Sequence, residues 1–106
     1  MVYGILRHTM KKKAMLLFED RMIYPDGAII EMRIWKLPRQ EAERPHGLKY
    51  SLFYGCNGER VIGYDNERGK GDHRHYRGRE MPYEFSTVFQ LVADFMDDIE
   101  RERSEK

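Results

Sequence analysis

The sequence predicts an α+β fold, in which an antiparallel β-meander of four to five strands packs against one C-terminal amphipathic helix. Three observations support this fold class. The run from Ala28 to Ile34 alternates apolar and polar residues with the period of a half-buried strand. Asn57-Gly58 is the strongest short hairpin signal in the chain. From Ser86 onward the apolar period changes from two residues to about 3.6, which indicates a helix.

The first two strands are expected on either side of the turn Pro25-Asp26-Gly27. Residues 15–24 are rich in strand-forming types, and an Asp-Gly pair tolerates the positive φ of a tight hairpin turn. The second strand has an apolar face and a polar face. Its apolar face carries Ala28, Ile30, Met32 and Ile34, and its polar face carries Glu31 and Arg33.

The third and fourth strands are expected at residues 48–55 and 59–66, joined by the Asn-Gly turn. The fourth strand leads directly into the segment Gly63 to Arg79, which is dense in charged residues, histidine and glycine. Because this segment offers little to a hydrophobic core, we expect it to be a surface loop anchored to the sheet.

The C-terminal helix is expected to begin after Ser86 as N-cap and to bury an apolar face against the sheet. That face consists of Val88, Leu91, Val92, Phe95, Met96 and Ile99, and the opposite, outer face carries Asp94, Asp97, Asp98 and Glu100. We interpret the acidic side as a solvated helix face in preference to a docking site for a basic partner. Residues 1–13 are expected to form an N-terminal extension, and residues 14–106 a single domain.

Composition narrows the function classes. A chain of 106 residues fits one domain, and its net charge of +1 conceals a local asymmetry. Residues 68–79 hold five Lys or Arg and one acid, whereas residues 94–106 hold six acids and three bases. The single cysteine, Cys56, excludes an internal disulfide framework. No export signal and no apolar run of membrane-spanning length is evident, so we expect a cytoplasmic protein without membrane contact.

The motif His73-Arg74-His75 is the centre of the predicted site. In an extended backbone both imidazoles point to the same side, where one could act as general base and the other as general acid in RNA cleavage. Nearby cations would stabilise the charge that develops on the phosphorane. The predicted catalytic residues are His73, His75, Lys70, Arg74 and Tyr76; the phosphate-binding residues are Arg68, Gly69, Gly71 and Arg77; and the orienting residues are Asp65, Glu67 and Asp72.

Other interpretations of the same residues stay open. An isolated His-x-His pair in a loop more often only forms hydrogen bonds. A metal site would need Asp72, or Asp65 with Glu67, beside the histidines, and the surrounding cations oppose it, so we expect no metal and no cofactor. Cys56 is interpreted as a turn residue, and His46 joins the site only if its proline-rich loop folds over it.

Several stretches resemble the TumE family of small proteins. They are Asp-Gly-Ala-Ile-Ile-Glu-Met-Arg-Ile-Trp from Asp26, Lys-Tyr-Ser-Leu from Lys49 and, most specific, Tyr-Asp-Asn-Glu-Arg-Gly-Lys-Gly-Asp-His from Tyr64. The resemblance extends over about residues 15–99 and not over residues 1–13. It implies a toxin that inhibits growth, together with a cognate helix-turn-helix antitoxin encoded beside it.

The residues and the resemblance together predict a toxin of a toxin-antitoxin system that acts as a small, metal-independent ribonuclease on RNA. One alternative is a non-enzymatic module whose basic segment only binds nucleic acid or the antitoxin. Another is a toxin that transfers part of a nucleotide onto a second molecule. The sequence carries no signal for an oligomeric state.

Overall fold

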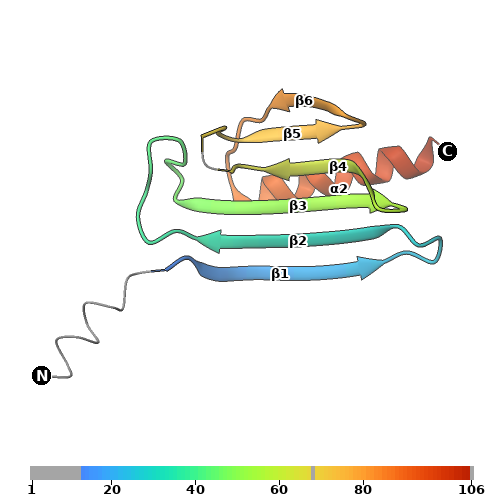
Figure 1. The fold of residues 1–106 in the computed structure, drawn as a ribbon, viewed down its shortest axis with the longest axis horizontal. Helices are drawn as coiled ribbons and strands as arrows, with labels where there is room; N and C mark the ends of the chain where they lie inside the picture. The colour runs from blue at the N-terminus through green and yellow to red at the C-terminus, as the bar shows by residue number, and fades with distance from the viewer. Residues whose placement is uncertain (1–12, 68, 106) are drawn as a thin grey trace, which may run out of the picture.

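The computed structural model describes residues 13–67 and 69–105, which form one six-stranded antiparallel sheet and one helix (Figure 1). The strands lie in the sheet in chain order, so the topology is an uninterrupted meander. The α+β fold class is confirmed, with six strands in place of the expected four to five. The elements are β1 (Met15–Ile23), β2 (Ile29–Lys36), β3 (Leu48–Cys56), β4 (Glu59–Asp65), β5 (His73–Tyr76), β6 (Arg79–Pro82) and α2 (Val88–Ser104).

The additional strands form a hairpin inside the segment that we expected to be a loop. Strands β5 and β6 pair from His73↔Pro82 to Tyr76↔Arg79. Their turn holds Arg77 at φ 51° and Gly78 at φ 81°, and two left-handed residues in succession match the twist of a tight hairpin. The expectation of a loop was wrong because the hairpin is short and lies at the sheet edge, where charged side chains need no burial.

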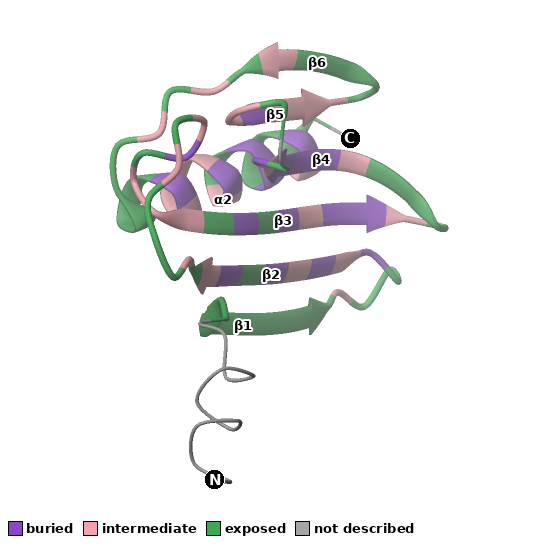
Figure 2. Ribbon diagram, turned by 60° about the vertical axis from the view of Figure 1, so that its left-hand side comes forward, coloured by how far each residue is buried: buried purple, intermediate pink, exposed green. Residues whose placement is uncertain are grey.

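Helix α2 covers one of the two faces of the sheet. It lies behind β3 and β4 in Figure 1, and the face toward it is the core face. Figure 2 shows buried residues alternating with more exposed ones along β2 and β3. The core consists of Ala28, Ile30, Met32, Ile34, Tyr50, Leu52, Tyr54, Ile62 and Tyr64 from the sheet, with Leu91, Phe95 and Ile99 from the helix. We call the opposite side of the sheet, which carries Glu31, Arg33, Trp35, Lys49, Ser51, Phe53, Asp65, His73 and His75, the open face.

The N-cap of helix α2 lies one residue later in the chain than expected. The N-cap is Thr87, whose hydroxyl accepts a hydrogen bond from the backbone amide of Gln90 at 3.0 Å. The apolar residues expected on the inner face include Leu91, Phe95 and Ile99, and all three are buried. The helical period therefore predicted the packing side correctly, and the neighbouring hydroxyl provides the cap.

Two acidic residues of α2 face the sheet. We expected Asp98 on the outer face, but it is only 4% exposed and accepts hydrogen bonds from Tyr64 at 2.5 Å and from the Arg74 guanidinium at 2.6 and 2.8 Å. Burial and this carboxylate raise the pKa of the Tyr64 hydroxyl, which therefore stays a donor. Glu102 is also buried and binds Tyr76 and Arg77. These contacts attach β4, β5 and the β5–β6 turn to the helix.

Replacing Asp98 with alanine should lower the free energy of unfolding by about 3 kcal/mol, because the Arg74 guanidinium and the Tyr64 hydroxyl then lose their partner in a partly buried place. Urea denaturation measures the change. The adjacent exposed Asp97 provides the control, since Asp97→Ala should change stability by less than about 0.5 kcal/mol. Equal losses in the two variants would contradict a structural role for Asp98.

Candidate functional site

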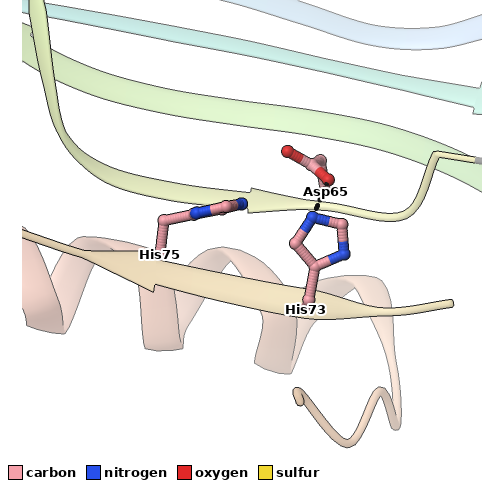
Figure 3. Close-up of side chains that lie close together, drawn as sticks. All are labelled: Asp65, His73 and His75. Atoms are coloured by element: carbon pink, nitrogen blue, oxygen red, sulfur yellow. Dashed lines mark ion pairs between the residues drawn. The ribbon is translucent and has the colours of Figure 1, made fainter. Parts of the chain in front are cut away.

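The two histidines of the motif meet one carboxylate on the open face. In the β4–β5 ladder Asp65 lies opposite His73, and Gly63 lies opposite His75. Figure 3 shows the three side chains on the same side of these strands. The imidazole centroids are 4.9 Å apart and the rings are nearly perpendicular, at 77°. The expectation that an extended backbone brings both rings to one side is therefore confirmed.

His73 lies between two hydrogen-bond acceptors. Its Nε2 is 2.5 Å from Oδ1 of Asp65, and its Nδ1 is 3.1 Å from the carbonyl oxygen of Gly71. An oxygen atom therefore lies beside each of the two ring nitrogens. The side chain is only 7% exposed, so Asp65 and Gly71 together fix the place and the orientation of the ring.

His75, in contrast, has a positively charged donor beside one ring nitrogen. The guanidinium of Arg60 donates from Nη2 to Nδ1 of His75 at 3.1 Å, so this nitrogen must be unprotonated. The other nitrogen, Nε2, faces the carboxylate of Glu80 at 3.2 Å. Burial and the positive charge of Arg60 lower the pKa of His75 below its ordinary value of 6.5. The two imidazoles of the site therefore have unlike neighbours, a carboxylate beside His73 and a guanidinium beside His75.

Arg60 reaches the open face through a β-bulge. Tyr54 pairs with Ile62 but Gly55 pairs with Arg60, so Val61 is an extra residue in β4. Without the bulge, Arg60 would share the core face with Ile62. Its side chain then lies over Gly63, where an added Cβ would come within 2.8 Å of Arg60 Cδ. The bulge and Gly63 together allow the Arg60 guanidinium to lie beside the histidines. Sequence periodicity alone could not predict that Arg60 or Glu80 belongs to the site.

Three predicted site residues lie away from the histidine pair. Arg74 and Tyr76 alternate with the histidines along β5, so they face α2, where Asp98 and Glu102 bind them. Arg77 is in the hairpin turn, and its guanidinium also binds Glu102. The structure therefore does not bring Arg74 and Tyr76, predicted as catalytic, or Arg77, predicted to bind phosphate, to the histidine pair: their contacts hold the hairpin against the helix.

The predicted residues before β5 are dispersed. Asp72 faces the core side and binds Nε2 of His46 at 2.9 Å, while the His46 ring packs 4.2 Å from that of Phe85. This pair stabilises the loop, so neither His46 nor Asp72 belongs to the histidine cluster.

The remaining predicted residues shape the loop itself. Gly69 donates its backbone amide to Glu43 at 2.6 Å, and exposed Lys70 closes a turn on Glu67 through its backbone amide. Gly71 supplies the carbonyl to His73. Arg68 lies outside the described residues.

A metal ion is a second chemical possibility for the cluster. Asp65, His73 and His75 each offer one ligand atom, and these atoms all lie within 4.8 Å of one another. Two histidines and one carboxylate form a set that divalent transition metals accept. The carboxylate is Asp65, not Asp72. Arg60 places a positive charge 3.1 Å from Nδ1 of His75, which opposes a cation at that nitrogen.

Comparison with protein families identifies the chain. The model of the family described as "Toxin TumE" matches residues 3–103. The chain belongs to the TumE toxin family. The match begins at residue 3, so it also includes most of the stretch that the resemblance left out. No curated protein and no solved structure matches the chain. Among the described residues, no helix is long and apolar enough to cross a membrane.

Arg60→Gln should raise the pKa of His75, because the charge that opposes its protonation is removed while a polar side chain remains. Gly63→Ala should act in the same direction, since the new methyl group displaces the Arg60 side chain. Titration of the imidazole resonances by NMR measures the shift. Arg33→Gln, also on the open face but paired with Glu19, is the control and should leave His75 unchanged. An unaltered pKa in the Arg60 variant would refute this electrostatic role.

Proposed function

We propose that this toxin is a ribonuclease that cleaves RNA without a metal ion, with His75 as general base, His73 as general acid and Arg60 on the phosphate. One observation carries the proposal: two imidazoles lie 4.9 Å apart, one beside the carboxylate of Asp65 and the other beside the guanidinium of Arg60. Two titratable groups in unlike environments are typical of acid and base assignments in enzymes. Lys70 and Arg68 remain predicted phosphate contacts from the adjoining loop.

The proposed chemistry starts from neutral His75, the form that its lowered pKa favours. Neutral His75 takes the proton of a ribose 2′-hydroxyl, and the 2′-oxygen attacks the adjacent phosphorus. The bond from phosphorus to the 5′-oxygen breaks, and His73 gives its proton to that leaving oxygen. The products are a 2′,3′-cyclic phosphate and a 5′-hydroxyl. Arg60 stabilises the additional negative charge, and its guanidinium, once engaged by phosphate, withdraws its hydrogen bond from Nδ1 of His75.

The acidic neighbours support both proton transfers. Asp65 fixes the orientation of His73 at Nε2, as the Gly71 carbonyl does at Nδ1. Glu80 faces Nε2 of His75, where it stabilises the imidazolium that forms when His75 accepts a proton. The orienting role predicted for Asp65 is part of this proposal, whereas Glu67 and Asp72 have no place in it.

The open face provides a surface for single-stranded RNA. Phe53 of β3 lies opposite Gly63 of β4, which lies opposite His75 of β5. An aromatic ring is therefore two strands away from His75 on the same face. Trp35 is half-buried, with the Lys49 ammonium 5.2 Å above its ring. Aromatic rings that stack bases, interleaved with cations, are typical of sheets that bind single-stranded RNA.

Family membership implies an antitoxin partner. We infer that this partner is of the helix-turn-helix type, that it blocks RNA cleavage, and that both proteins act in the cytoplasm. A metal-dependent nuclease is the second candidate, supported by the mutual distances within the Asp65–His73–His75 cluster. The two candidates differ in product, because a metal-activated water leaves no cyclic phosphate.

His75→Gln and His73→Gln should each lower the rate of RNA cleavage by about 10²–10⁴-fold, the usual contribution of a positioned acid or base. Growth inhibition should fall in parallel. His46→Gln is the matched control, since this histidine packs on the opposite side of the sheet and should retain cleavage. Circular dichroism establishes that each variant is folded. Full cleavage by both folded site variants would refute the assignment.

The rate of cleavage should decrease as the pH falls below about 6.5, since protonation then removes the general base. Because its surroundings lower the pKa of His75, the midpoint of this acidic limb should lie below the ordinary imidazole value. Cleavage in excess EDTA, with analysis of the 3′ ends, separates the two candidates. Activity that survives EDTA and yields cyclic phosphate supports the proposal. Activity abolished by EDTA and restored by Mn²⁺ or Zn²⁺ supports the metal-dependent enzyme.

A further inference from the structure

Strand β1 is an exposed apolar edge. All nine of its residues are exposed, and Figure 2 shows the strand as the outermost one of the sheet, with no other described element over it. Long apolar edge strands with unpaired backbone groups are templates for pairing with another chain. Of the exposed large hydrophobic residues among those described, β1 holds Met15, Leu16, Leu17, Phe18, Met22 and Ile23, and the start of α2 holds Val88 and Phe89.

The sequence of β1 mirrors itself about Asp20. On one side are Glu19 and then Phe18, and on the other are Arg21 and then Met22. In an antiparallel pair of two such strands centred on Asp20, each acidic residue next to the centre lies opposite a basic one, and each apolar residue lies opposite an apolar one. Such self-complementarity is what a two-fold symmetric interface requires, because the same patch must bind itself.

We propose that β1 pairs antiparallel with β1 of a second copy of this chain, with the two-fold axis at Asp20 and perpendicular to the sheet. Two sheets then become one continuous sheet. Glu19 lies opposite Arg21 of the second copy on the open side, and Phe18 lies opposite Met22 of the second copy on the core side. The partner is a second copy because the residues mirror one another in both charge and apolar character.

The charges next to β1 extend this match. Within one copy, Glu19 pairs with Arg33 of β2 at 2.8 Å and Arg21 pairs with Glu31 of β2 at 3.4 Å. The proposed register therefore creates a row of alternating sign across the interface, from Arg33 through Glu19 to Arg21 and Glu31 of the second copy. The symmetry produces a second, identical row. At the axis Asp20 lies opposite Asp20 of the second copy, which opposes the pairing, whereas the two alternating rows favour this register over others in which their charges would meet like charges.

The apolar contact lies on the helix side. Leu17 and Phe18 line a groove of about 570 Å³ with Ile34 of β2 and residues Val88, Phe89, Val92 and Ala93. In the dimer, Met22 of the second copy lies beside Phe18 and extends the floor of this groove. A register shift at Leu17 marks the end of the regular ladder, so residues 18–22 form its centre.

A two-fold axis perpendicular to the sheet keeps both open faces on the same side of the dimer. Both histidine clusters then face the same direction, each on the β4 and β5 strands away from the interface. The dimer therefore presents one broad surface with two equivalent sites. The pairing itself depends only on β1 and β2, so its failure would leave the proposed function untouched.

Analytical ultracentrifugation of the full chain tests the dimer. The wild-type protein should have the mass of a dimer at micromolar concentrations. Glu19→Arg places two bases opposite each other, and Arg21→Glu places two acids opposite each other, so each variant should dimerise at least about tenfold more weakly. An equimolar mixture of the two variants should recover a dimer of near wild-type affinity, because the two bases of one strand then meet the two acids of the other. Asp20→Asn removes the like charges at the axis and should tighten the wild-type dimer.

Each contrary result overturns the proposal. A wild-type monomer at about 1 mM would exclude the dimer, and protected β1 amides in that monomer, measured by hydrogen exchange, would show that another segment covers the strand. A dimer equally stable in both single variants would use a different surface. A mixture that fails to recover association, while circular dichroism shows both variants folded, would exclude the register centred on Asp20.

Discussion

The contact of Asp98 with Arg74 and Tyr64 determines which side chains of β5 face the helix and which face the open side of the sheet. It binds β4 and β5 to α2 through a buried carboxylate and three donor atoms of two side chains, at distances of 2.5 to 2.8 Å. Because side chains alternate along a strand, fixing Arg74 toward the helix fixes His73 and His75 toward the other face. One ion pair on the core side thereby sets the orientation of two histidines with which it has no direct contact.

The two faces of the sheet therefore have different roles: the core face stabilises the fold, and the open face carries the proposed chemistry. The core face contains the aromatic and aliphatic residues that exclude water, and the two buried carboxylates that α2 turns toward it, Asp98 and Glu102, are paired with Arg74 and Arg77. The open face contains buried His73 and half-buried His75 together with Asp65 and Arg60, and Arg60 lowers the pKa of His75. Gly63 occupies a position where any side chain would compete with Arg60 for space. A glycine within a strand usually weakens it, so this residue is better explained by the close approach of the guanidinium.

Periodicity in the sequence predicted most of the fold and only part of the site. Four strands, two tight turns and the helix were predictable because each has an apolar face or an Asp-Gly or Asn-Gly pair. The β5–β6 hairpin escaped prediction because Arg77-Gly78 is a less characteristic turn. Arg60 escaped because a bulge reverses the alternation on which prediction depends, and Asp98 because a charged residue on a helix normally faces water.

The two edges of the sheet differ in how they avoid unwanted pairing. Strand β6 is four residues long, carries Arg79 and Glu80, and ends in Pro82, which has no amide hydrogen to offer another strand. These are the usual protections of a free edge. Strand β1 is nine residues long and has apolar residues at both ends. Its charged centre, Glu19-Asp20-Arg21, would normally discourage pairing, but in one antiparallel register its outer charges attract each other. Strand β1, the edge without these protections, is therefore the one that we propose to pair with a second copy of the chain.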